Sequence, residues 1–385
     1  MKEKIAYRVN RIEPSGIREF FDLVLGMKNI ISLGIGEPDF VTPWHIREAG
    51  IYGLEQGYTS YTSNQGLPQL RKAIAQYLKR RFNLKYDPDD EILITVGVSE
   101  AYDLAIRALV NPGEEVLIPQ PCYVSYYPVA VLAEGKPRYI STANCGFKLT
   151  PELLISSISP RTKILVLNYP SNPTGVTYSR EELRALVKVI KDKDLIVISD
   201  EIYAELTYDQ EHVPLTSLPG MKLRTIYLNG FSKAFAMTGW RLGFACGPKE
   251  IISAMNKIHQ YTMLCAPILS QMAGIEAILR GESAVRDMCL EYRRRRDYIV
   301  ERLRDMELDF VYPQGAFYVY VNIKKTGLSS REFAVRLLKE KKVAVVPGVA
   351  FGPGDNDNYV RMAYTVDFDI LKKAIDRIED FMRSL

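Results

Sequence analysis

The stretch Gly230–Gly243 reads GFSKAFAMTGWRLG and follows an apolar run, Thr225–Leu228, that predicts a buried strand. Lys233 is therefore expected just past a strand end, with a hydroxyl at Ser232 and a second cation at Arg241. The residues next to the lysine are uncharged, and desolvation in such surroundings lowers the pKa of an amine and leaves it nucleophilic. Imine formation with an aldehyde requires such an amine. Because a single lysine after a strand is usually a solvated loop residue, the functional interpretation depends on the rest of the chain.

The same order of strand, polar loop and helix recurs upstream of this stretch. Four further apolar runs, each followed by a polar or aromatic residue, are Ile92–Val96, Val116–Ile118, Ile164–Leu167 and Leu195–Ser199. Strands that alternate with helices predict a mostly parallel, doubly wound α/β sheet. Ligands bind beyond the carboxyl ends of the strands in such sheets, so we expect five strands to deliver functional groups to one edge.

A change of pattern along the 385 residues predicts two domains and an arm. The strand–helix alternation ends near Gly281, after which a long helical pattern, Glu282–Met306, precedes a mixed set of short strands and helices. We expect a large domain that binds the cofactor over residues 44–281 and a small α+β domain over residues 282–385. Residues 1–43 are expected to form an N-terminal arm that packs with the small domain.

The composition argues against nucleic-acid-binding, metal-binding and membrane proteins. The 50 basic and 46 acidic residues are interspersed, and the net charge of +4 gives no reason to expect nucleic acid. The five cysteines form no C-x-x-C pair, and the three histidines lack the spacing of metal ligands. The sequence has neither a signal-peptide pattern nor an apolar run long enough to span a bilayer, so we predict a cytoplasmic protein. The densest basic cluster, Arg293–Arg296, is interpreted as the solvated face of a helix.

Residues at the predicted sheet edge suit a ligand with a phosphate and a flat ring. Gly97-Val98-Ser99 opens a helix, whose free N–H groups and dipole favour a phosphate. Ser232 and Arg241 add a hydroxyl and a bidentate cation for the same group. Tyr123 offers a face on which an aromatic ring can stack.

Polar residues at the same edge suit the remaining groups of such a ring. Asp200 could pair with a protonated ring nitrogen, a charge-assisted bond of roughly 1.5–3 kcal/mol, although an acid in this position is also a common helix cap. Asn172 and Tyr203 could both bond a ring hydroxyl, and Lys233 could hold an aldehyde. The compound that carries all of these groups is pyridoxal 5′-phosphate.

Seven motifs spread over nearly the whole chain are typical of one family. They are Leu33–Phe40 (LGIGEPDF), Tyr61–Arg71, Gly97–Ala101 (GVSEA), Ser171–Gly175 (SNPTG), Ser199–Tyr203 (SDEIY), Gly230–Gly243 and Tyr359–Tyr364 (YVRMAY). On these motifs the chain resembles the class I aminotransferases of fold type I, which depend on pyridoxal phosphate, and in particular their bacterial and archaeal branch that acts on aspartate and aromatic amino acids. The resemblance implies that an amino group moves from an L-amino acid to a 2-oxo acid by a ping-pong mechanism.

The resemblance also implies roles for individual residues. Lys233 would form the Schiff base with the cofactor and later act as general base, while Asp200 would keep the ring nitrogen protonated. Tyr203 and Asn172 would bind the ring oxygen, and Tyr123 would stack on the ring, although many relatives have tryptophan there. The phosphate would be held by Val98, Ser99, Ser232 and Arg241, and by Tyr61 reaching across from the other subunit of a homodimer with shared sites. The substrate carboxylate would be held by Arg361, Gly36 and Asn172.

The N-terminal arm is expected to line the pocket for the substrate side chain. It reads Pro14-Ser15-Gly16-Ile17, with an apolar wall from Ile17 and a hydroxyl from Ser15. An apolar wall favours large uncharged side chains, while hydroxyls and ordered waters can still hold a carboxylate. We therefore expect aromatic donors with 2-oxoglutarate as acceptor, in preference to strict use of aspartate.

Several alternatives remain open on the sequence. The same site could belong to an aspartate aminotransferase of broad specificity, or to a related pyridoxal-phosphate lyase or decarboxylase. A non-enzymatic sensor is disfavoured because no additional N-terminal domain is evident, and a nucleotide-dependent oxidoreductase because the glycine fingerprint is missing. We also predict that the Asn172-Pro173 peptide bond is cis, as tight turns at functional strand ends often require.

Overall fold

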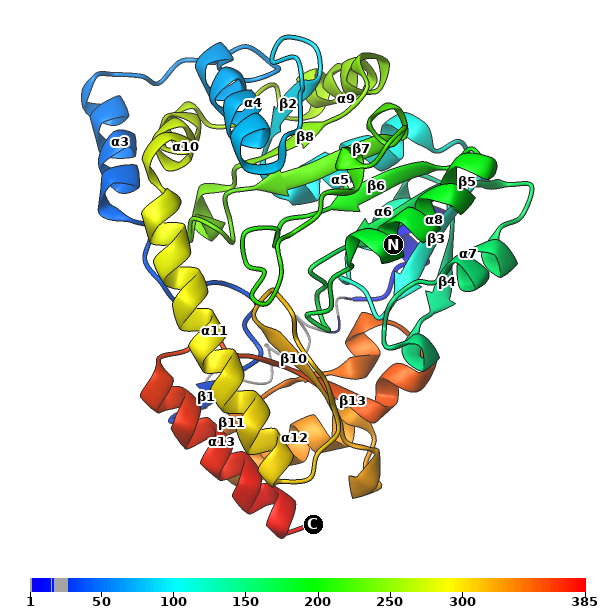
Figure 1. Ribbon diagram of the computed structural model, residues 1–385, viewed down its shortest axis with the longest axis vertical. Helices are drawn as coiled ribbons and strands as arrows, with labels where there is room; N and C mark the ends of the chain where they lie inside the picture. Colours follow the sequence, from blue (N-terminus) through cyan, green and yellow to red (C-terminus); the bar gives the residue numbers. More distant parts are fainter. Residues whose placement is uncertain (1, 15, 17–26) are drawn as a thin grey trace.

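The computed structural model describes residues 2–14, 16 and 27–385. Its centre is a seven-stranded sheet (Figure 1). The strands are β2 (Ile92–Thr95), β3 (Glu115–Gln120), β4 (Lys136–Ser141), β5 (Thr162–Asn168), β6 (Ile196–Asp200), β7 (Thr225–Gly230) and β8 (Gly243–Cys246). They lie in the order β2-β8-β7-β6-β5-β3-β4, and only β8 runs antiparallel to its two neighbours. The predicted α/β class is confirmed, whereas β8 was not expected, because its four residues follow the lysine loop without a turn signal.

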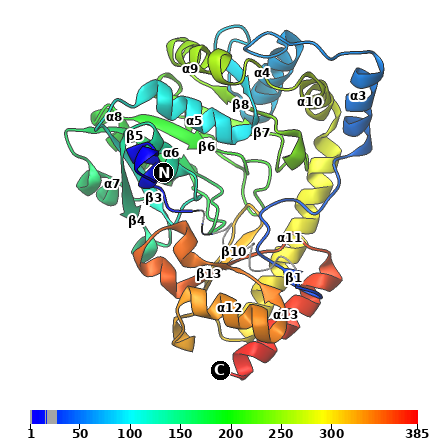
Figure 2. The ribbon, with the colours of Figure 1, turned by 180° about the vertical axis from the view of Figure 1, so that it is seen from behind.

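Helices cover both faces of this sheet, which explains why its strands are apolar along their length. One face carries α5 (Gly97–Leu109), α6 (Tyr126–Leu132) and α9 (Lys249–Thr262) (Figure 2). The other face carries α7 (Pro151–Ser157), α8 (Arg180–Asp192), α4 (Pro68–Phe82) and α10 (Ile268–Arg280), and α3 (Trp44–Glu55) packs on α10. Along β5, Ile164 and Val166 join the first of these cores and Leu165 and Leu167 the second. Side chains thus alternate between the faces, as the two-residue period of a strand requires.

A smaller sheet lies below the large one in Figure 1. It is antiparallel, with the order β12 (Val346–Pro347), β13 (Tyr359–Ala363), β10 (Tyr318–Asn322) and β9 (Phe310–Val311). The helices α12 (Ser330–Lys341) and α13 (Phe368–Arg383) share a core with this sheet. The run Val343–Val346 divides, because β11 (Val343–Ala344) pairs in parallel with β1 (Ile31–Ser32) instead of joining the sheet.

The N-terminal segment contacts both parts of the molecule. β1 attaches to the smaller part through β11, whereas the short helix α1 (Tyr7–Asn10) lies near α6 of the larger part. Arg8 Nη1 lies 3.2 Å from Glu134 Oε1, just beyond α6. The chain therefore reaches the sheet edge before it turns toward the C-terminal half.

The helix α11 (Glu282–Asp305) connects the two parts, and its arginine cluster is not the solvated face that we predicted. The side chains of Arg293 and Arg294 are at least half exposed, but those of Arg295 and Arg296 are 5% and 1% exposed. Four consecutive residues of an α-helix are spread over about 300° of its circumference, so they cannot share one face. Arg295 pairs with Asp39 at 2.8 Å, and Arg296 pairs with Asp209 at 2.6 Å.

The backbone bears on two further expectations, the cis peptide bond and the membrane-spanning helix. The Asn172-Pro173 bond is cis, as predicted, and Gln120-Pro121 and Tyr169-Pro170 are cis as well. Among the described residues, no helix combines the length and the apolar character needed to cross a bilayer.

Candidate active site

A cavity of about 750 Å³ opens where the carboxyl ends of β5, β6 and β7 meet the start of α5. It also receives residues from β10, β13 and the loop after β1, so both parts of the molecule form its wall. Of the predicted site residues, the cavity is lined by Gly36, Val98, Ser99, Tyr123, Asn172, Asp200, Tyr203, Ser232, Lys233, Arg241 and Arg361. These residues span most of the chain, and the fold brings them together.

Two predicted residues are not part of this wall. The side chain of Tyr61 is 82% exposed and lies outside the cavity. Ile17, expected to line the substrate pocket, lies outside the described residues, as does Ser15. The expectation of an apolar wall from the N-terminal arm therefore has no structural counterpart among the residues described.

Lys233 lies three residues after β7 and enters the cavity. Its Nζ donates a hydrogen bond of 2.8 Å to the carbonyl oxygen of Gly36. Burial lowers the pKa of Lys233 to about 8, and the positive charges of Arg361 and Arg241 act in the same direction, while Glu37 opposes them. The amine can therefore lose its proton close to neutral pH, as a nucleophile or base must.

Asp200 ends β6 and is buried beneath the cavity. Burial raises the pKa of its carboxyl to about 6. A hydrogen bond of 2.7 Å from the hydroxyl of Tyr126 to Oδ2 opposes this shift, as does the backbone N–H of Ile202, 3.2 Å from Oδ1. The bond from the Ile202 N–H is the one expected if Asp200 caps the following turn. The bond from Tyr126 on α6 to Oδ2 is not part of such a cap, and Tyr126 itself lines the cavity.

Tyr203 is coupled to a residue of the smaller sheet. Its hydroxyl lies 2.8 Å from that of Tyr318 on β10, and the Tyr318 hydroxyl is 3.4 Å from the carbonyl oxygen of Gly36. The ring of Tyr203 also faces the Lys233 amine, with Nζ 5.9 Å from the ring centroid. Lys233 and Tyr318 thus share the Gly36 carbonyl oxygen, and Tyr203 contacts both of them.

Arg361 lies on β13 and is almost completely buried. Nη1 donates to Asn172 Oδ1 at 2.9 Å, and Nη2 donates to the carbonyl oxygen of Gly34 at 2.6 Å. The guanidinium lies over the ring of Tyr318, 4.4 Å from its centroid, while Nε has no hydrogen-bond partner among the residues that the structure describes. Burial lowers the pKa of Arg361, although a guanidinium stays charged in proteins. A buried cation without a carboxylate partner is suited to hold an anion that enters the cavity.

The first turn of α5 and Arg241 form the opposite wall. Gly97 has φ of +78°, and a Cβ built on it would lie 2.7 Å from Arg241 Nη2. Only glycine therefore allows the guanidinium to approach the backbone at the start of α5. The first N–H groups of a helix have no partner within it, so they and Arg241 together provide a cradle for an anion.

Sequence reasoning missed several residues that line the cavity: Glu37, Tyr102, Tyr126, Thr238 and Tyr318. Tyr126 lies three residues after Tyr123, a spacing that places two side chains on one face of a helical turn, and this signal could have found it. Tyr318 had no such signal, because it opens a strand whose first four residues are all apolar or aromatic. Thr238 Oγ1 donates to Glu37 Oε2 at 3.0 Å, a contact between segments 201 residues apart that no local pattern predicts.

Comparison with known proteins agrees with this geometry. The family described as Aminotransferase class I and II matches residues 28–378. YugH of Bacillus subtilis, an aminotransferase by name, is 52% identical over 97% of both chains. The aspartate aminotransferase of Pyrococcus abyssi is 46% identical over 98% of this chain and 97% of its own. The solved aromatic aminotransferase of Pyrococcus horikoshii superposes with a TM-score of 0.90 at 42% identity, covering 96% of this chain and 99% of its own.

The match over almost the full length, and the convergence of the motif residues on one cavity, lead to the same conclusion. The chain belongs to the class I and II aminotransferase family and is an enzyme of the transaminase type.

Proposed function

We propose that the protein uses pyridoxal 5′-phosphate to move the amino group of an L-amino acid, preferably an aromatic one, to a 2-oxo acid such as 2-oxoglutarate. The observation that carries this proposal is the position of Lys233, an amine whose pKa burial lowers to about 8, in a cavity that also holds a buried acid and a buried arginine. The cavity of about 750 Å³ is large enough for the cofactor and a substrate.

The residues present fit the cofactor. The cradle of Gly97 and Arg241, extended by the hydroxyls of Ser99 and Ser232, suits the phosphate. Asp200 would pair with the ring nitrogen, and the ring oxygen would be bonded by Tyr203 and Asn172. Tyr123 would lie against the ring; its own ring is 5.7 Å from that of Tyr126, which holds Asp200.

When bound, pyridoxal phosphate supplies an aldehyde carbon for the amino group and a protonated ring that accepts electrons from the substrate Cα. Lys233 Nζ, once released, would take the proton from that carbon and hold it. General base catalysis of this kind accelerates a reaction by roughly 10²–10⁴-fold. Asp200 must be ionised to keep the ring nitrogen protonated. Arg361 would bind the α-carboxylate and orient the Cα–H bond toward Nζ.

The first experiment locates the cofactor. Borohydride reduction of the protein with pyridoxal phosphate should fix the pyridoxyl group on Lys233, as peptide mass mapping would reveal. Lys233→Ala should still bind the cofactor but lose this label and the transaminase activity. Lys257→Ala, which removes an exposed lysine of α9, serves as the matched control and should keep both. A label on another lysine would contradict the proposal.

The preference for aromatic donors follows from the charges around the cavity. Among the described residues that line it, the cations are Lys233, Arg241 and Arg361, and each has a role toward the cofactor or the α-carboxylate. Glu37 adds a negative charge, and Ile35 adds an apolar side chain that is 41% exposed. A distal carboxylate thus finds no additional cation within the described wall, whereas an aromatic ring finds apolar surface.

The relatives do not decide between donors, because aspartate and aromatic aminotransferases are both among them. We expect kcat/KM for phenylalanine to exceed that for aspartate at one fixed 2-oxoglutarate concentration, with some aspartate activity retained, since one apolar contact group is worth roughly 1–3 kcal/mol. A preference for aspartate of about tenfold or more would favour the second candidate, an aspartate aminotransferase of broad specificity. Product formation without any 2-oxo acid acceptor would indicate a lyase instead.

We further propose a homodimer in which Tyr61 reaches the phosphate site of the second subunit. Its hydroxyl lies outside the cavity of its own chain, and further large apolar side chains among the described residues are unusually exposed. These include Val41, Trp44, Tyr52, Tyr261 and Met263, each more than half exposed. Asn64 joins the two segments, with Nδ2 2.7 Å from the carbonyl oxygen of Leu264. Contact with a second copy of the chain would remove such side chains from water.

A further inference from the structure

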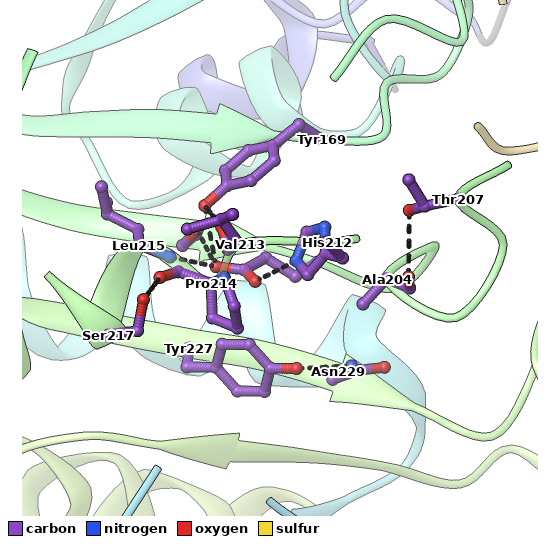
Figure 3. A network of polar contacts seen from close by, with 12 residues as sticks. Tyr169, Ala204, Thr207, His212, Val213, Pro214, Leu215, Ser217, Tyr227 and Asn229 are labelled. Carbon is purple, nitrogen blue, oxygen red and sulfur yellow. Dashed lines mark hydrogen bonds and ion pairs between the residues drawn. The ribbon is translucent and has the colours of Figure 1, made fainter. Parts of the chain in front are cut away.

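A second polar cluster lies beside Asp200 and is sealed from solvent. Glu201 is 0% exposed, and so is the side chain of His212, whose Nε2 lies 2.6 Å from Glu201 Oε2. The other oxygen, Oε1, accepts from Ser199 Oγ at 2.7 Å and from the backbone N–H of Leu215 at 3.2 Å. The Tyr169 hydroxyl is a further donor, 3.2 Å from Oε1. Figure 3 shows Tyr169 and His212 directed at this network from two sides.

These contacts indicate the charges within the cluster. The Leu215 N–H can only donate, and the Ser199 and Tyr169 hydroxyls each have a proton to give, so Glu201 Oε1 is placed as an acceptor of hydrogen bonds. His212 Nε2 is placed to donate to Oε2, while its Nδ1 has no hydrogen-bond partner within the described part of the chain. A buried anion is costly unless its lone pairs are satisfied, and Glu201 meets this condition with donors from separate segments.

Two of the donors, Tyr169 and Ser199, come from the segments that carry the cofactor-facing residues. Tyr169 directly follows β5 and lies three residues before Asn172. Ser199 and Glu201 flank Asp200, and Tyr203 is two residues further on. The Asp200 carbonyl oxygen also accepts from Asn168 Nδ2 at 2.9 Å, and the Glu201 N–H donates to the Leu228 carbonyl of β7 at 2.9 Å. Successive side chains of a strand point to opposite faces, so Glu201 is fixed on the face away from the cavity while Asp200 faces into it.

We propose that Glu201, with His212, is a positioning residue that holds the ends of β5 and β6 in register, so that Asp200, Tyr203 and Asn172 meet the cofactor ring together. The inference rests on the proposed use of pyridoxal phosphate. The carboxylate of Asp200 has two hydrogen-bond donors among the described residues, the Tyr126 hydroxyl and the Ile202 N–H. The cluster around Glu201 therefore determines where the backbone of Asp200 lies, although it does not itself contact the cofactor.

The test compares variants that change the donors or the acceptor of this cluster. Glu201→Gln replaces an acceptor oxygen by an NH₂ group that faces donors, and His212→Phe removes the donor to Oε2. His212→Gln is the conservative variant, since its amide can still donate. Glu115→Gln is the matched control: Glu115 is a buried acid at the start of β3, the strand end remote from the cavity, and accepts from Ser159 at 2.7 Å and Arg138 at 3.0 Å.

Three quantities are measured for each variant: the Kd of the apoprotein for pyridoxal phosphate, the visible circular dichroism of the bound cofactor and the Tm of the apoprotein. We expect Glu201→Gln and His212→Phe to raise the Kd by about tenfold to a hundredfold and to change the dichroism, which reports the orientation of the ring. His212→Gln should restore both, and Glu115→Gln should lower the Tm alone.

The outcomes separate the inference from the proposed function. If the unaltered protein does not bind pyridoxal phosphate, the proposed function is wrong. If it binds but Glu201→Gln and His212→Phe keep its Kd and dichroism, with or without a lower Tm, the cluster is merely structural and the inference is overturned. Should Glu201→Gln fail to fold, the contrast between His212→Phe and His212→Gln decides the question.

Discussion

At the scale of single residues, burial moves the two central ionisable groups toward their neutral forms. The pKa of Lys233 falls to about 8 and that of Asp200 rises to about 6, in both cases chiefly through desolvation. For Lys233 the neutral form is the useful one, because an amine must be free to react. For Asp200 the charged form is required. The hydrogen bond from Tyr126 favours this form, because it lowers the pKa that burial raises.

The effect on stability has a definite sign. Between the ordinary pKa of an aspartate, about 3.9, and about 6, the folded protein holds a proton on Asp200 that the unfolded chain has released. The free energy of unfolding therefore falls as the pH rises through this window. Loss of the Tyr126 hydrogen bond extends the window to higher pH, because it raises the pKa of Asp200 further.

Tyr126→Phe should accordingly weaken cofactor binding in a pH-dependent manner. We expect the Kd for pyridoxal phosphate to rise by about tenfold near pH 6 and by less near pH 8.5, where Asp200 is ionised even in the variant. Titration of the apoprotein with the cofactor at several pH values measures this. Tyr127→Phe is the control, since Tyr127 stacks on Tyr139 at 5.1 Å and does not bond Asp200. A loss that is equal at all pH values would contradict the role assigned to Tyr126.

At the scale of elements, buried arginines hold α11 in place, although their charge led us to predict that they are exposed. Arg296 Nη1 lies 2.6 Å from Asp209 Oδ2 and donates to the carbonyl oxygen of Pro313 at 2.9 Å. The hydrogen bond from Arg296 lowers the pKa of Asp209, so this contact stabilises the fold above the ordinary pKa of an aspartate and loses its effect as the pH falls. Arg296 thereby links the connecting helix to the loop that follows the Tyr203 turn.

Asp209→Ala should destabilise the protein, because it leaves a buried guanidinium short of its partner. We expect a loss of about 2–3 kcal/mol in the free energy of unfolding, measured by chemical denaturation at neutral pH. Asp287→Ala, which removes an exposed acid of the same helix, is the control and should cost less than about 0.5 kcal/mol. Equal effects of the two variants would show that burial of Arg296 does not matter.

At the scale of the whole molecule, the outer side of α3 and α10 leaves apolar groups in contact with water. Figure 1 places α3 at the edge of the molecule beside α10. The exposed apolar side chains include Trp44, Tyr52 and Leu54 on α3 and Leu279 on α10. Tyr61, in the loop after α3, and Tyr261, near the end of α9, are 82% and 84% exposed, values that a monomer has little reason to keep for aromatic side chains. Burial of this surface against a second copy would explain them and would bring Tyr61 toward a second cavity.

Light scattering should therefore give the mass of a dimer, with an interface on the order of 2,000 Å² or more. Tyr61→Phe should leave the dimer intact and raise the Kd for pyridoxal phosphate, because it removes only a hydroxyl expected to bond the phosphate. Tyr261→Phe is the control and should change neither quantity. A fully active monomer, or an unchanged Kd in Tyr61→Phe, would contradict the shared site.

The order of elements and the chemistry of the main cavity were determined by the sequence itself. Apolar runs of strand length at regular intervals fix the α/β class, because only a sheet covered on both faces buries such strands completely. Lys233, Asp200 and Asn172 could be predicted because each lies at the carboxyl end of a strand or within four residues of it, and parallel strands present these ends at one edge. The division into residues 1–43, 44–281 and 282–385, and the roles toward the cofactor, stay predictions.

What only the tertiary structure decided are contacts between segments distant in the chain. The Glu201–His212 pair, the anchoring of Arg296 by Asp209 and the hydrogen bond between Tyr203 and Tyr318 join residues 11, 87 and 115 positions apart. Sequence patterns indicate which face of an element is buried, but they do not indicate which residue will bond a polar group that is buried in the protein. The buried arginines show why: a charged residue is assigned to the surface by its type, and it is buried only where the fold supplies a partner whose bonds offset its desolvation.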